Sequence, residues 1–179
     1  MLIFYKIKTI FLRQSLAYEK LLIEQRALAK TNPKVYNIYM VDTLNNLAVL
    51  YSDNNQMKKA EESYIEALRL YITLAKINPN VYNTDSEDTL NNLAILYKDY
   101  NQTQKTKEAY GEALTLYRAL AKTNPKIYGI DLANSLVMGV YLLNQPSINL
   151  DEAEAILQKF SGIPKAEQLL GLIEKLPKR

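Results

Sequence analysis

The sequence of 179 residues contains no cysteine and no histidine, and only five of its residues are glycine. Without cysteine there is no disulfide and no thiolate metal site, and the chain offers neither a thiol nucleophile nor an imidazole base. No glycine-rich phosphate loop occurs, and no serine stands beside a base in the manner of a catalytic triad. The sequence therefore predicts a protein that is not an enzyme and that uses no cofactor or metal.

The chain also has little excess charge of either sign. Its 22 basic and 19 acidic residues are mixed along the sequence and leave a net charge of +3, whereas nucleic-acid binding needs a basic face. Residues 1–12 are largely apolar, but Lys6 and Lys8 interrupt them and no small-residue cleavage site follows. This pattern favours an amphipathic helix over a signal peptide or a membrane span. We expect no nucleic-acid partner, no membrane span and a cytoplasmic location.

An internal repeat dominates what is present. The stretch D-T-L-N-N-L-A at residues 42–48 returns at residues 88–94, which is a shift of 46 residues. A second motif, Ala-Lys-x-Asn-Pro, begins at residues 29, 75 and 121 and has the same period. A fixed period of about 20–50 residues is typical of stacked repeat arrays, in which each unit packs on its neighbours.

The spacing of apolar residues predicts helices at residues 5–30, 41–53, 57–77, 86–100, 104–123, 131–143, 150–160 and 165–176. In the first of them, the residues at the spacing of one helix face are Phe11, Leu12, Ser15, Leu16, Tyr18, Leu22 and Leu28. The Asn-Pro pairs at 32–33, 78–79 and 124–125 are expected to end helices, because proline cannot continue one. Residues 36–40 are expected to form a connector. Turns are expected at residues 52–55, where side chains bond their own backbone, and at residues 144–149.

The fold class that follows is all-α, a right-handed α-solenoid of antiparallel helix pairs that each combine a short and a long helix. One repeat domain is expected over residues 1–179. Its parts are a half-repeat helix at 1–36, repeats at 37–82 and 83–128, a degenerate repeat at 129–162 and a capping helix at 163–179. The last repeat is degenerate because Gly139 and Val140 stand where the earlier copies have Leu and Ala.

The spacing within the repeat resembles that of a known family. The tetratricopeptide signature is W-x2-L-G-x2-Y followed by A-x3-F, and its offsets are matched here by Leu44, Leu47, Ala48, Tyr51, Ala60, Tyr64 and Ala67. The second copy departs once, with Thr106 in the place of Ala60. The long period, together with L-N-N-L-A, resembles the repeats of kinesin light chains over residues 41–143, and over residues 12–36 as a half-unit. Six tyrosines stand at core spacing, namely Tyr51, Tyr64, Tyr71, Tyr97, Tyr110 and Tyr117.

The resemblance implies a peptide-binding groove on the polar face of the short helices. In particular, it implies that the second asparagine of L-N-N-L-A, which is Asn46 or Asn92, grips the backbone of a bound peptide. A carboxamide suits this role because it both donates and accepts hydrogen bonds. The alternative is that the asparagines cap helices or bond between neighbouring helices. The full set of expected groove residues is Asp42, Asn45, Asn46, Val49, Asp53, Asp88, Asn91, Asn92, Ile95, Lys98 and Asp99.

The expected groove is acidic and polar, with an apolar floor from Val49 and Ile95 and no cluster of cations that could clamp a carboxylate. A basic or neutral peptide is the natural ligand, so the predicted function is a scaffold that holds an extended or helical segment of an unidentified protein. Two alternatives remain. The first is a homodimer or oligomer assembled through the N-terminal helix, by way of Phe4, Ile7, Ile10 and Phe11. The second is that the chain is a fragment of a longer array.

Overall fold

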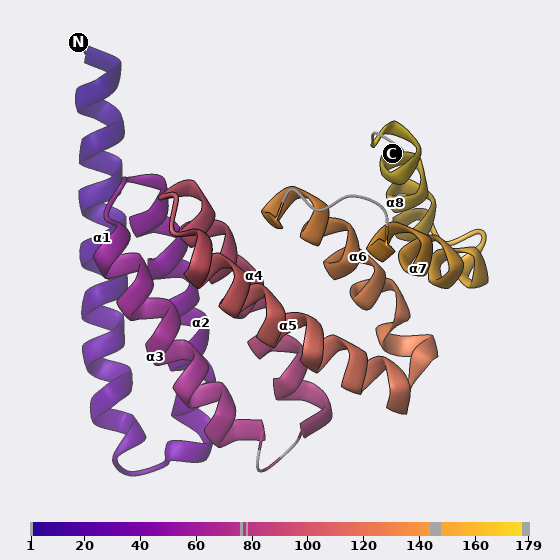
Figure 1. Ribbon diagram of the computed structural model, residues 1–179. Helices are drawn as coiled ribbons and strands as arrows, with labels where there is room; N and C mark the ends of the chain where they lie inside the picture. The colour runs from indigo at the N-terminus through magenta and orange to yellow at the C-terminus, as the bar shows by residue number, and fades with distance from the viewer. Residues whose placement is uncertain (1, 76, 78, 144–147, 177–179) are drawn as a thin grey trace. The chain divides into compact units, whose positions relative to one another are not determined.

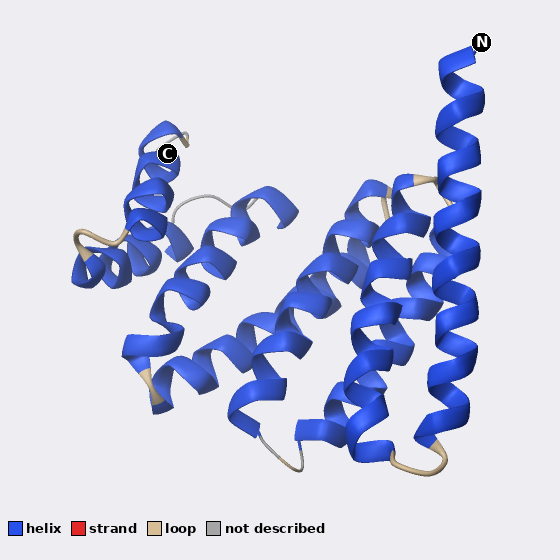
Figure 2. Ribbon diagram, turned by 180° about the vertical axis from the view of Figure 1, so that it is seen from behind, coloured by secondary structure: helices blue, strands red, loops and turns tan. Residues whose placement is uncertain are grey.

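The computed structural model describes residues 2–75, 77, 79–143 and 148–176. Within them the chain forms eight α-helices and one 3-10 turn, without a strand (Figure 2). The helices are α1 (Leu2–Ala29), α2 (Pro33–Asp53), α3 (Met57–Ala75), α4 (Pro79–Asp99), α5 (Thr103–Thr123), α6 (Pro125–Leu143), α7 (Ile148–Leu157) and α8 (Pro164–Lys175), with η1 (Gln158–Phe160) after α7. The all-α prediction is confirmed. The predicted turn at 144–149 lies largely outside the described residues, as do the side chains of Phe4 and Ile7.

Three helices begin earlier than the sequence predicts, and the connector expected at residues 36–40 is wrong. The helices α2, α4 and α6 start at Pro33, Pro79 and Pro125. Proline suits the first helical position because its fixed backbone angle is helical and its missing N–H would be unpaired there. Asn32 before Pro33 is non-helical (φ −140°, ψ 77°), and its carbonyl accepts a hydrogen bond from the Tyr36 N–H at 3.1 Å. Asn32 and Asn124 therefore each lie between two helices, and the prolines at 33, 79 and 125 open α2, α4 and α6.

The expected alternation of short and long helices is wrong for the same reason. The helices α2 to α6 contain 19 to 21 residues each. The predicted repeat boundaries after residues 36, 82 and 128 fall inside α2, α4 and α6. The division of the chain into those repeats stays a prediction.

The turns after α2 and α4 repeat one backbone geometry. Asn55 and Asn101 both have a φ of 57°, the left-handed conformation that asparagine tolerates better than most residues. After α2, the Gln56 N–H donates to the Tyr51 carbonyl at 2.8 Å and the Asn55 N–H donates to the Ser52 carbonyl at 2.9 Å. Bonds of the same pattern follow α4, at 2.8 and 2.9 Å. The predicted turn at residues 52–55 is confirmed.

The chain divides into two compact units, Met1–Thr89 and Leu90–Arg179, and the division falls within α4. In the first unit α2 packs against both α1 and α3, and the N-terminal end of α1 extends past the turn between α2 and α3 (Figure 1). The ring of Phe11 on α1 meets that of Tyr51 on α2 edge-on, with centroids 6.5 Å apart. The expected face of α1 is partly wrong, because Leu12, Leu16 and Leu28 are exposed.

The second unit is built on α6, which packs against α5 and α7, while α8 packs on α7. Its core combines residues from all four helices, namely Tyr117, Leu132, Ala133, Leu136, Leu150, Ala153, Leu157, Ala166, Leu169 and Ile173. The six tyrosines predicted to be buried are buried in their respective units. The glycine at position 139, where the earlier copies have leucine, leaves room for Tyr110. A Cβ atom there would overlap the hydroxyl group of Tyr110.

Candidate peptide-binding surface

One line of predicted groove residues runs along the exposed side of α2. Asp42, Asn46, Val49 and Asp53 are all exposed, and their spacing of four, three and four residues places them on one side of a helix. The residues on the opposite side, Leu44, Leu47 and Ala48, are buried in the first unit. The hydrophobic side thus packs α2 into the unit and leaves the polar side facing solvent.

Two residues that the sequence reasoning missed extend this line towards the start of α2. Val35 is 41% exposed and Tyr39 is 54% exposed. They continue the same spacing, because Tyr39 lies three residues before Asp42 and Val35 lies four residues before Tyr39. They were missed because residues 36–40 were assigned to a connector. The signal that could have found them is the proline at position 33, which can open a helix as well as end one. We call the six residues Val35, Tyr39, Asp42, Asn46, Val49 and Asp53 the α2 face.

A matching line lies on α4. Asp88, Asn92 and Asp99 are exposed and Ile95 is half-buried, at the same spacing as their counterparts on α2. Asp88 belongs to the first unit and the other three residues belong to the second.

The predicted groove cation, Lys98, is engaged within the second unit. Its Nζ atom lies 3.3 Å from the ring centroid of Tyr141 and donates to the carbonyl oxygen of the same residue. A cation held over an aromatic face in this way is attracted by the ring's negative face. Lys98 is therefore committed to a contact between α4 and α6.

The two asparagines of each L-N-N-L-A stretch have different surroundings. Asn45 donates from Nδ2 to the Tyr71 hydroxyl at 3.3 Å and accepts from the Thr89 hydroxyl at 3.2 Å, which links α2 to α3 and α4. Asn91 is 6% exposed, and its Oδ1 atom has no hydrogen-bond partner within the described residues. Asn46 and Asn92 are both exposed. Asn45 thus bonds between neighbouring helices, the alternative weighed from the sequence, while Asn46 is exposed.

A family comparison agrees with the spacing of the buried residues. Residues 41–78 match the family model of the tetratricopeptide repeat. This segment is a tetratricopeptide repeat. It covers most of α2 and all of α3, and its small residues Ala48, Ala60 and Ala67 are fully buried, as the close approach of two helices requires. A comparison with curated protein sequences found no match.

The α2 face of the tetratricopeptide repeat is acidic. Asp42 and Asp53 supply two carboxylates to the α2 face, which contains no lysine or arginine. Partial burial raises the pKa of the Asp42 carboxyl group. Burial, together with the charge of Asp53, raises the pKa of Tyr64 to about 12. A positively charged ligand is therefore favoured over an anion at this surface.

The tetratricopeptide repeat is a non-catalytic type of scaffold. None of the helices in the described residues is both long enough and apolar enough to cross a membrane. Within the same residues, no three acidic side chains gather in a way that could hold a metal ion.

Proposed function

We propose that the chain is a scaffold that binds an extended or helical segment of a partner protein along the α2 face and its counterpart on α4. Tetratricopeptide repeats in general mediate protein–protein interactions, and residues 41–78 are such a repeat. The observation that supports the proposal best is the α2 face itself, a continuous line of exposed residues that includes two large apolar side chains, Tyr39 and Val49. In the array that we propose, successive helix pairs stack into a right-handed solenoid, and these lines form its concave side.

The chemistry of the α2 face indicates how it would hold a peptide. The Asn46 carboxamide can donate to a peptide carbonyl and accept from a peptide N–H, whatever the peptide's side chains are. Tyr39 and Val49 on either side of it offer apolar contact, and tyrosine combines a large apolar surface with a polar hydroxyl group. Asp42 and Asp53 favour a lysine or arginine on the ligand. The ligand that fits is a basic segment with at least one apolar side chain.

Selection from a random-peptide library on the immobilised wild-type chain tests this function. We expect selected peptides to be enriched in lysine, arginine and apolar residues. Asn46→Leu and Asn92→Leu should each lower the affinity for the best peptide by about tenfold, because a peptide group buried in the complex loses its hydrogen-bond partner. Arg69→Leu, an exposed change on α3, is the matched control and should leave binding unchanged. Unchanged binding by both asparagine variants, with helical content intact by circular dichroism, would overturn the proposal.

Self-association through α1 is the second candidate, and one observation favours it. Leu12, Leu16 and Ile23 are 55%, 67% and 66% exposed, at a spacing that places them on one side of α1. Leu12 and Leu16 also help to line a pocket of about 320 Å³. Phe11, which was expected at such an interface, is instead buried within the first unit. Light scattering should then give a mass above 20.5 kDa, and Leu16→Lys should return it to that of one chain. A wild-type chain that stays monomeric at high concentration would exclude this candidate.

A further inference from the structure

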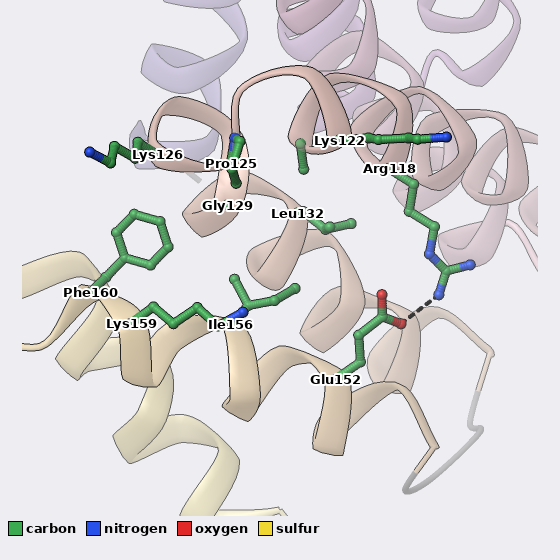
Figure 3. Close-up of a pocket in the computed structure, with 11 residues that line it drawn as sticks. Arg118, Lys122, Pro125, Lys126, Gly129, Leu132, Glu152, Ile156, Lys159 and Phe160 are labelled. Carbon is green, nitrogen blue, oxygen red and sulfur yellow. Dashed lines mark hydrogen bonds and ion pairs between the residues drawn. The ribbon is translucent and has the colours of Figure 1, made fainter.

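The second unit contains a pocket of about 540 Å³ that takes no part in the proposed peptide surface. It lies between the C-terminal end of α5, the first turns of α6, and α7 with η1 (Figure 3). Its volume falls within the range of about 300–1,000 Å³ that is usual for small-molecule sites. Its apolar lining comes from Ala121, Pro125, Gly129, Leu132, Ile156 and Phe160.

Gly129 gives this pocket its shape. A Cβ atom at this position would lie 2.7 Å from the ring carbons Cε2 and Cζ of Phe160, so any larger residue would require the ring to shift. The missing side chain lets the Phe160 ring approach the backbone of α6. Asn37 stands at the matching position of the period in α2, 92 residues earlier. Glycine inside a helix lowers stability by about 1 kcal/mol relative to alanine. The close approach of Phe160 to α6 therefore depends on a residue that is otherwise unfavourable in a helix.

The rim of the pocket is positively charged. Arg118 is paired with Glu152 at 2.6 Å, and these two charges cancel. Three further cations line the pocket, Lys122, Lys126 and Lys159. They are exposed and form no ion pair within the described residues. The N-terminus of α6 opens onto the pocket at Pro125, and the positive end of a helix dipole adds to the same potential. Figure 3 shows Lys126 and Phe160 at one end, the Arg118–Glu152 pair at the other, and Ile156 and Leu132 between them.

From these features we propose that this pocket binds a small anionic amphiphile, a carboxylate attached to an aliphatic or aromatic body. The apolar body lies against Phe160, Ile156 and Leu132, where it is removed from water. The carboxylate stays at the rim, where Lys126 and Lys159 neutralise it. Charge complementarity selects the anion, because a cation of the same shape would meet three unpaired lysines and one carboxylate that is already paired.

Isothermal titration with two probes of matched length tests the proposal on the full chain. Decanoate carries the expected charge, and decyltrimethylammonium has the same tail with the opposite charge. We expect decanoate to bind with one-to-one stoichiometry, at least about tenfold more tightly than the cation. Equal affinity for the two probes, or no binding of decanoate below its aggregation concentration, would overturn the proposal.

Charge-reversal variants distinguish binding of decanoate at the rim lysines from a general effect of surface charge. Lys126→Glu combined with Lys159→Glu should weaken decanoate by more than about tenfold, while Lys107→Glu, an exposed change on α5 outside the pocket, should have little effect. In a nitrogen-15 spectrum, decanoate should move the amide resonance of Gly129 but not those of Gly111 and Gly171, which lie outside the pocket lining. Equal weakening by Lys107→Glu, or shifts spread over all these glycines, would mean unspecific association.

A third probe distinguishes a small molecule from a protein segment with the same chemistry. The acetylated and amidated peptide Glu-Leu-Glu-Leu offers carboxylates and apolar side chains together. If it binds more tightly than decanoate and the lysine variants abolish its binding, the pocket is a protein-docking surface and the small-molecule assignment is wrong. Peptides selected on the α2 face should bind the lysine variants normally, so failure of either proposal leaves the other intact.

Discussion

Asn45 in the first unit and Asn91 in the second stand at the same position of the 46-residue period, yet their surroundings differ. The Oδ1 atom of Asn45 accepts from the Thr89 hydroxyl at 3.2 Å. The period places Ser135 opposite Asn91, but both the Oδ1 atom of Asn91 and the Oγ atom of Ser135 are buried without a hydrogen-bond partner in the described part of the chain. Equivalent positions of the period therefore differ in their polar network.

A second difference is the loss of one side chain on α6. Gly139 stands where the earlier copies carry Leu47 and Leu93, and the hydroxyl of Tyr110 occupies the space beside it. That hydroxyl donates to the carbonyl oxygen of Ser135 at 3.2 Å. The second unit thus joins α5 to α6 through a tyrosine and a backbone carbonyl. A repeat copy can lose its signature residues and still pack, provided that a neighbouring side chain fills the space.

Restoring leucine at position 139 should have the largest effect on this comparison. We expect Gly139→Leu to lower the free energy of unfolding by about 3 kcal/mol, because the new side chain overlaps the rigid ring of Tyr110 in a packed interior. Urea unfolding followed by circular dichroism measures the loss. Combining the change with Tyr110→Ala should recover part of it by making room.

A control for the change of glycine itself lies in the same unit. Gly111 on α5 has no atom near the position of a Cβ, so Gly111→Ala should raise the stability by about 0.5–1 kcal/mol through helix propensity alone. If Gly139→Leu were as favourable as Gly111→Ala, the assignment of Tyr110 as the space-filling residue would be wrong.

Removing the buried hydroxyl group of Thr89 should lower the free energy of unfolding, whereas removing that of Ser135 should not. Thr89→Val leaves the Oδ1 atom of Asn45 without its partner at nearly constant shape, and we expect a loss of about 2 kcal/mol. Ser135→Ala removes a buried hydroxyl whose Oγ atom has no partner within the described residues, so stability should be unchanged or slightly higher. Equal losses in the two variants, measured in the same urea titrations, would show that the hydrogen-bond networks are alike.

A smaller effect should distinguish Tyr64 in the first unit from Tyr110 in the second under alkaline conditions. Burial and the charge of Asp53 raise the pKa of Tyr64 from 10.0 to about 12. Burial also raises the pKa of Tyr110, while the charge of Arg118 lowers it and the charge of Glu152 raises it. Because the folded pKa is raised, the stabilising contribution is fully present below pH 10 and is lost as the pH rises towards 12.

Absorbance titration at 295 nm measures this difference directly. The difference between the wild-type and Tyr64→Phe titration curves reports the ionisation of Tyr64. Its midpoint should lie at a higher pH than the midpoint obtained in the same way for Tyr110. The wild-type chain should also lose about 1 kcal/mol more stability than Tyr64→Phe between pH 9 and pH 11. A Tyr64 that titrates at or below the midpoint of Tyr110 would contradict the assigned environments.

Much of the helical architecture could be predicted from local spacing. The tetratricopeptide offsets, the buried tyrosines and the turn at residues 52–55 all follow from residue types within one period. The starts of α2, α4 and α6 were predicted too late, because a proline can either end a helix or occupy its first position. The choice depends on the backbone before it, and at Asn32 that backbone is non-helical. Val35 and Tyr39 were missed at the candidate site as a direct result.

The sequence by itself determined the 46-residue period, the all-helical class and the match of residues 41–78 to the tetratricopeptide repeat, because these depend on spacing along one chain. Only the tertiary structure decided that Asn45 is bonded between helices while Asn46 is exposed. Which of two adjacent asparagines faces another helix depends on where the other helices pack. It also decided the pocket beside Gly129, where Phe160 approaches from a segment 31 residues away. Burial and pocket shape arise from contacts between distant segments, and spacing within one segment does not contain them.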